Sequence, residues 1–400
     1  MTDLSTPKTA SLDKILRGKV PTFIVQRSAR GNKRTPEVLA GLIDDHGKDL
    51  GVGTSIKMWG KTQKTLSEYL GPLDEVPLRL ADPVLYRHPK SAWPGMDTID
   101  EAKTPPKFAF YEDLPVGVDR NWISRVIQAQ YSVGATVALS ANGWVSTTNA
   151  AAALDAAMAV ARESRDIVGD KPMFVNLTLD KEWLLDRQLR NLLLRELVES
   201  NEKQWYLRFW WPEMTNSYGQ LTDDAILRGY MRLASTARIE GKRLFLPNSG
   251  LTGWLMGAYG ASGFSTGASA TDQAFARQRR IGRRKGQKAP PATPRIFDRF
   301  LLHTMEHSVF ERIRVLPEHR AFPTRFLDEI DAGSHKPELA GLHYVKSVGD
   351  LQAKMAAKDR LVVAHRPINR ASKWVKGLAN VDKPTGASNP GHLEVWRELQ

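Results

Sequence analysis

The sequence predicts an α/β protein whose main part is a (β/α)8 barrel of the TIM type. Short apolar and β-branched segments alternate with amphipathic helical segments over about 250 residues. About seven strands are clear and an eighth is weak, a count that suits a closed barrel better than an open doubly wound sheet. The open sheet is the alternative. It is disfavoured because no G-x-G-x-x-G follows a strand and no G-x-x-x-x-G-K-[ST] occurs, and these are its usual nucleotide-binding motifs.

The elements follow one another in the order that this fold requires. Strands are expected at residues 22–26, 52–58 (the weak one), 78–81, 135–140, 172–177, 205–211, 244–247 and 263–266. Helices are expected at residues 35–46, 61–70, 121–133, 148–164, 181–200, 222–240 and 251–259. Parallel strands need such crossover helices, and strands covered on both faces are apolar throughout.

Outside the barrel, which we expect at residues 20–270, the chain changes character. Residues 1–19 form a polar leader without apolar periodicity, which we expect to be flexible. A basic, proline-containing arm spans 271–294 and leads into a helical extension at 295–365. In that extension we expect helices at 295–314 and 348–357 and a strand at 360–364, followed by a basic tail at 366–400.

The charge of the chain favours a polyanionic partner. Lys and Arg number 57 against 44 Asp and Glu, which gives a net charge of +13 and a pI near 9.7. Seven cations and no acid fall in one short stretch of the arm: Arg277, Arg279, Arg280, Arg283, Arg284, Lys285 and Lys288. We expect this stretch to bind the phosphates of a nucleic acid, because seven unpaired cations repel one another without a polyanion. The alternatives are a solvated loop or a contact with an acidic partner subunit.

Composition also excludes several classes of site. The chain has 0 Cys, so it has no disulfide, thiolate nucleophile or Cys-ligated metal. No stretch approaches the length of a membrane span, and the N-terminus lacks the basic and then apolar order of a signal peptide. We therefore expect a cytoplasmic protein without a membrane partner. No cofactor signature is present.

In barrels of this type the chemistry lies at the carboxyl ends of the strands. Asp82 and Asp180 each follow an apolar strand, and either would serve as general base or nucleophile if burial raised its pKa. Asp180 would otherwise cap the following helix. Arg208, inside an aromatic strand, is expected either to face a ligand at the barrel mouth or to pair with a buried acid.

Residues that would hold an anion also follow the strands. Arg27 comes after the first strand, and Ser265 and Thr266 end the last one among small residues. Backbone amides after the last strands of such barrels often bind phosphate. These residues, with or without Arg208, would suit an alternative function, an enzyme acting on a phosphorylated or anionic small molecule.

A short motif in the extension gives a second alternative. His303, Glu306 and His307 match H-x-x-E-H, the inverted zinc-protease pattern, and two His four residues apart share a helix face. The pattern is short and no further acidic ligand is evident. We therefore expect ordinary helical histidines and no metal site, with a metal-dependent hydrolase as the alternative.

The order of elements over residues 243–310 resembles the last third of the tRNA-guanine transglycosylase barrel, a family that exchanges a guanine base in nucleic acid. Both show a strand, turn, short helix and strand, then a basic segment and a His-bearing helix. The chain has Phe264, Ser265 and Thr266 where that family carries its nucleophilic Asp, and it lacks the cysteines of the family's zinc site. The resemblance implies a nucleic-acid-binding relative that either modifies a base through another acid, Asp272 or Asp82, or has no catalytic activity.

Taken together, these features favour a nucleic-acid-binding barrel in which base modification, a transferase reaction, is an open question. The choice between DNA and RNA is also open, as is membership of a protein complex.

Overall fold

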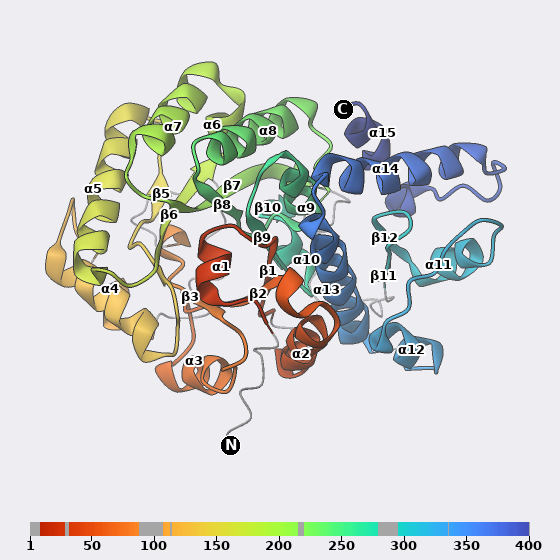
Figure 1. Cartoon of the computed structure of the whole chain (residues 1–400), viewed down its shortest axis with the longest axis horizontal. Helices are drawn as coiled ribbons and strands as arrows, with labels where there is room; N and C mark the ends of the chain where they lie inside the picture. Colours follow the sequence, from red (N-terminus) through yellow and green to blue (C-terminus); the bar gives the residue numbers. More distant parts are fainter. Residues whose placement is uncertain are drawn as a thin grey trace, which may run out of the picture.

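The computed structural model shows a barrel of parallel strands surrounded by helices (Figure 1). The described residues are 9–28, 32–87, 107–112, 114–214, 220–278, 295–334 and 336–399. The barrel strands are β1 (Thr22–Gln26), β2 (Gly51–Lys57), β3 (Leu78–Asp82), β4 (Ala138–Leu139), β6 (Met173–Asp180), β7 (Gln204–Met214), β8 (Arg243–Leu246) and β9 (Gly263–Gly267). The expected fold class is confirmed, and the weak strand is β2.

The barrel closes because β9 pairs in parallel with β1, with Thr22 opposite Gly263. Around the rest of the ring each strand pairs with its sequence neighbour, except between β3 and β4. There the Thr136 backbone N–H donates to the Arg79 carbonyl (2.9 Å), and the Arg79 N–H donates to the Thr136 hydroxyl (2.8 Å). The ring is therefore nearly continuous.

Helices follow the strands on the outside. They are α2 (Thr35–His46), α3 (Gln63–Leu70), α4 (Arg120–Ser132), α5 (Ala150–Val168), α6 (Glu182–Leu185), α7 (Arg187–Glu199), α8 (Asp224–Ile239) and α9 (Gly250–Tyr259). The single helix expected at 181–200 is divided at Asp186, whose carboxylate accepts from Gln188 and Leu189 and begins α7. None of the described helices is long and apolar enough to cross a membrane.

The amino-terminal end of the barrel is closed by α1 (Leu12–Leu16), which lies at the centre of the view in Figure 1. Ile15 is fully buried and packs with the lumen side chains of the strands, among them Ile24 and Phe174. These residues fall in the segment for which a flexible leader was expected. Because α1 covers this end and its Ile15 fills it, a site inside the barrel would open at the carboxyl-terminal mouth.

The helix that completes the barrel comes late in the chain. α13 (Pro337–Ala353) packs against α2, α9 and β1, the position of an eighth barrel helix. Gly349 permits this approach, because a Cβ there would lie 2.5 Å from a methyl of Leu42. Between β9 and α13 come α10 (Ala270–Gln273), β10 (Ala276–Gln278), β11 (Arg295–Asp298), β12 (His303–Glu306), α11 (His307–Arg314) and α12 (Arg325–Asp331).

Two expectations for the C-terminal part were wrong. The helix expected at 295–314 is a β11–β12 hairpin followed by α11, because Asp298 accepts from the N–H groups of Phe300 and Leu301 and turns the chain. The strand expected at 360–364 is the start of α14 (Arg360–Gly377), which Asp359 caps by accepting from Val362 (3.0 Å). The tail contains most of α14 together with α15 (His392–Arg397).

Candidate functional site

The carboxyl-terminal mouth of the barrel is lined by polar side chains that point inward. Lumen-facing residues alternate along each strand, and the register sets Thr178 of β6 opposite Arg208 of β7. Asp82 ends β3, on the far side of the ring from β7. Asp82 and Arg208 are both buried, with 3% and 0% of their side chains exposed.

Arg208 makes an ion pair with Asp82 across the lumen. One Nη lies 2.5 Å from Asp82 Oδ2, the other donates to the Thr178 hydroxyl (3.1 Å), and Nε donates to Asn248 Oδ1 (3.3 Å). The Tyr86 ring stacks on the guanidinium, with its centroid 4.6 Å from Cζ. Burial alone would lower the pKa of Arg208, but the Asp82 carboxylate together with Tyr86 and Tyr206 outweighs it and the pKa is raised. Of the two roles expected for Arg208, the structure shows pairing with a buried acid.

The backbone on both sides of this pair is strained. Asn248 has a φ of 53°, and its side-chain amide donates to Gln26 Oε1 (2.5 Å) while its backbone N–H donates to the Ser265 hydroxyl (2.8 Å). Val84 also has a φ of 53°, which costs a β-branched residue about 1–3 kcal/mol. The Val84 N–H donates to Asp82 Oδ1 (2.8 Å). The strain is thus tied to the residues that hold the ion pair in place.

These contacts limit what Asp82 can do chemically. Its two carboxylate oxygens are occupied by Arg208 and by the N–H of Val84. A proton transfer or nucleophilic attack by Asp82 would have to break a buried ion pair, so its position fits electrostatic support and orientation better.

Asp180 is the carboxylate better suited to acid–base chemistry. It is the last residue of β6, two positions after Thr178, so its side chain also faces the lumen, and it is half-buried. Burial raises its pKa above the usual range, against a hydrogen bond that Oδ1 accepts from the Glu182 N–H (3.1 Å). That bond also satisfies the N–H of the first residue of α6, although the N-cap position itself is Lys181.

A second ion pair at the mouth joins Lys57 and Asp272. Lys57 ends β2, and its Nζ lies 2.9 Å from Asp272 Oδ1, while the Ser269 hydroxyl donates to Oδ2 (2.5 Å). Burial would raise the pKa of Asp272, but Lys57 and the hydroxyls of Ser269 and Ser28 together hold it below the usual range. Lys57 was not foreseen, because its strand was the weakest in the sequence. Its place at the carboxyl end of that strand was the signal available.

The expected phosphate-binding residues are not brought together. Ser265 faces the lumen, but Thr266 faces outward, and its hydroxyl lies 3.1 Å from the Tyr344 hydroxyl of α13. Arg27 also lies on the outside, with its guanidinium carbon 4.4 Å from the centre of the Tyr69 ring of α3. Successive residues of a strand point to opposite faces, so Ser265 and Thr266 cannot share one ligand in the lumen.

Most of the basic arm falls outside the described residues: Arg279, Arg280, Arg283, Arg284, Lys285 and Lys288. The backbone of Arg277 belongs to β10, which pairs in parallel with the end of β7. Its partners on β7 lie beyond Arg208, so the arm starts at the mouth of the barrel. The predicted role of these cations stays a prediction.

The H-x-x-E-H residues do not converge. His303 lies on β12, is buried, and has its Nε2 3.2 Å from the Ala387 carbonyl, and burial lowers its pKa to about 4. Glu306 is exposed and pairs with Arg295, while His307 begins α11 and pairs with Glu311. The motif predicted that the two histidines share one helix face, but His303 lies on a strand of the hairpin and His307 on the following helix.

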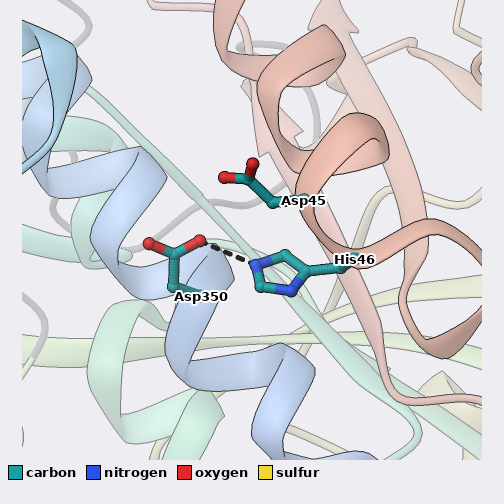
Figure 2. Close-up of side chains that lie close together, drawn as sticks. All are labelled: Asp45, His46 and Asp350. Atoms are coloured by element: carbon teal, nitrogen blue, oxygen red, sulfur yellow. Dashed lines mark hydrogen bonds and ion pairs between the residues drawn. The ribbon is translucent and has the colours of Figure 1, made fainter.

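One cluster in the described part of the chain has the spacing of a metal site. Asp45 and His46 end α2 and face Asp350 of α13, with His46 Nε2 2.8 Å from Asp350 Oδ1 (Figure 2). The ammonium of Lys346 lies 2.7 Å from Asp45 Oδ2 and 2.5 Å from Asp350 Oδ1, so a cation already bridges the two acids. The cluster clamps α13 to α2 and needs no metal for charge balance.

Comparison with known proteins adds no relative. No family model matches the sequence, and neither the curated proteins nor the solved structures contain a match. The chain is therefore characterised by its fold and its own side chains, as a (β/α)8 barrel with a buried Arg208–Asp82 ion pair at its mouth.

Proposed function

We propose that this chain is a nucleic-acid-binding (β/α)8 barrel. The observation that carries the proposal is the excess of cations, 57 Lys and Arg against 44 Asp and Glu, with an acid-free group of seven between Arg277 and Lys288. Binding of such a group to phosphates releases counterions and is largely independent of base sequence. The pairing of β10 with the end of β7 supports a nucleic acid that runs past the barrel mouth.

The mouth itself is the place where a base would be recognised or modified. In this proposal Asp180, with its raised pKa, would exchange a proton with the base, and the partly exposed Lys57 would orient it. The buried Arg208–Asp82 pair would hold the neighbouring strands and side chains in place. The likeness to the transglycosylase barrel belongs to this proposal only. Ser265 in place of that family's nucleophilic Asp favours recognition without base exchange.

The experiment compares the full chain with a variant in which Arg283, Arg284 and Lys285 are changed to Gln. Binding to a labelled single strand is followed by fluorescence anisotropy over a series of salt concentrations. The slope of log Kobs against log salt should become shallower by about two, since each lost phosphate contact removes about 0.7 from it.

A control variant carries the same loss of charge elsewhere, at exposed cations of the outer helices: Lys64→Gln, Arg187→Gln and Arg232→Gln. Its salt slope should equal that of the unmodified chain. Equal slopes for the arm variant and the control would show that the arm does not hold the nucleic acid. Binding of an anionic small molecule that survives in the arm variant would favour the metabolic alternative at the mouth.

A further inference from the structure

Four cations on the C-terminal elements are near enough for electrostatic repulsion to link each of them to at least one of the others. Arg299 lies in the turn between β11 and β12, Arg320 precedes α12, Lys354 begins η6 (Lys354–Ala356) directly after α13, and Arg370 is in the middle of α14. The hairpin and the start of α14 both pack against α13 or its end (Figure 1). We refer to Arg299, Arg320, Lys354 and Arg370 as the cationic cluster.

Aromatic rings pack against three side chains of the cationic cluster. The Phe322 ring lies under Arg299, at 4.7 Å from the guanidinium carbon, and its centroid is 5.9 Å from the Lys354 ammonium. The Phe300 ring lies 4.6 Å from the guanidinium carbon of Arg370. These contacts hold the stems in place and leave the charged ends with unused hydrogen-bonding capacity.

Counter-charge for the cluster is scarce among the described residues. Arg299 is 11% exposed and its one carboxylate partner is Asp350, at 3.3 Å, which Lys346 and His46 also share. Asp298 lies near Arg370, but it is committed to His319 at 2.8 Å and to the turn of the hairpin.

Two guanidinium donors in the cluster have no acceptor. The Nε atoms of Arg299 and Arg370 are buried and find no hydrogen-bond partner in the described structure. A buried donor without an acceptor is unfavourable, so the packing that holds these two guanidinium groups in place has a cost in free energy.

The electrostatics agree with this geometry. Burial lowers the pKa of Arg299, Lys354 and Arg370, and repulsion by neighbouring cations of the cluster lowers each of them further. Repulsion between partly buried like charges is unfavourable, and a bound anion would offset it.

We propose that the cationic cluster is a binding site for a phosphoryl group. Guanidinium groups match the tetrahedral oxygens of phosphate through paired N–H donors, and the Lys354 ammonium adds a point charge. A phosphate would accept from the outer Nη groups of the guanidinium side chains and would neutralise the repulsion. If the phosphoryl group belongs to a nucleic acid backbone, this inference rests on the proposed function. A free phosphorylated molecule would use the same chemistry.

The test uses the full chain and a double variant, Lys354→Gln with Arg370→Gln. The matched control is Lys358→Gln with Lys373→Gln, which removes the same charge from exposed residues next to and within α14. The melting temperature is measured in sodium phosphate and in sodium chloride of equal ionic strength. Phosphate should stabilise the unmodified chain and the control more than chloride does, and the apparent phosphate affinity should fall about ten- to a hundredfold in the double variant.

Melting in chloride alone distinguishes a binding role from a structural one. Loss of mutually repelling cations should leave the double variant as stable as the control or more so, whereas a structural role predicts a lower melting temperature than the control. Equal responses of the unmodified chain to phosphate and chloride would overturn the proposal. So would a double variant that keeps the full response to phosphate.

A competing single strand without terminal phosphates identifies the source of the phosphoryl group. Weaker oligonucleotide binding by the double variant than by the control assigns the site to a nucleic acid backbone. Equal oligonucleotide binding by the two variants, with a response to phosphate that the control keeps and the double variant loses, assigns it to a free phosphorylated molecule. If the chain binds no oligonucleotide but phosphate still stabilises it through the cluster, the proposed function fails while this site stands.

Discussion

The buried pair of Asp82 and Arg208 gives the sharpest test of the mouth, through Asp82→Asn. Asn keeps the shape of Asp but loses the charge, and it offers one acceptor oxygen where the structure uses two, toward Arg208 and toward the Val84 N–H. In either orientation of the amide one donor is left without an acceptor, and Arg208 remains charged with 0% of its side chain exposed.

Breaking a fully buried ion pair on one side costs about 3–5 kcal/mol. For a chain of 400 residues the entropy of unfolding makes this a fall of about 4–6 °C in melting temperature, if the barrel unfolds as one unit. The assay is thermal and urea unfolding followed by circular dichroism. The double variant Asp82→Asn with Arg208→Met should recover much of the loss, because the uncompensated charge is gone.

An unchanged urea midpoint for Asp82→Asn would mean that the ion pair is not buried in solution. A double variant whose loss of stability equals the sum of the losses of Asp82→Asn and Arg208→Met alone would mean that the two residues are not coupled.

Three further changes test other parts of the structure. Gly267→Ala should destabilise the fold by about 1–3 kcal/mol in urea unfolding, since its Cβ would lie 2.6 Å from the Ser28 hydroxyl, and unchanged stability would contradict this. Burial lowers the pKa of His303 to about 4 in the folded chain, against 6.5 in the unfolded chain. The unfolded chain therefore binds more protons between these values, and this group lowers the free energy of unfolding by about 3 kcal/mol as the pH drops from 6.5 to 4. His303→Phe should flatten that part of a pH series of urea midpoints, and an unchanged pH profile would argue against it. Lys346→Met should destabilise the α2–α13 clamp by about 1–3 kcal/mol, and EDTA should not alter the melting of the unmodified chain. A chelator-sensitive melting temperature would instead indicate a metal at Asp350.

The barrel was predictable because each of its strands is a short apolar segment followed by a helix, and the closed ring needs only that repeat. What the sequence could not reveal is long-range pairing. Asp82 and Arg208 were both recognised as mouth residues, but 126 positions separate them and no local pattern joins them. The ion pair between them shows that Asp82 is a paired carboxylate, whereas the sequence suggested a free one.

The errors arose where local patterns were ambiguous. The apolar run at 360–364 suits a strand as well as a helix, and Pro367 inside α14 obscured the continuation of the helix. The segment 295–314 has many apolar residues, and only the Asp298 turn distinguishes a hairpin from a helix. The lumen or outward direction of Ser265 and Thr266 follows from strand parity, which a one-residue shift reverses.

The most direct test of the central claim is a binding series of the unmodified full chain. Affinity for a single-stranded DNA, a duplex DNA and a structured RNA is measured by anisotropy from low to physiological salt. The chain has 57 Lys and Arg against 44 Asp and Glu, and this positive charge predicts binding to at least one of the three nucleic acids at low salt. Log Kobs should then fall linearly and steeply as log salt rises. Absence of binding to all three at low salt, or an affinity that does not change with salt, would contradict a nucleic-acid-binding function.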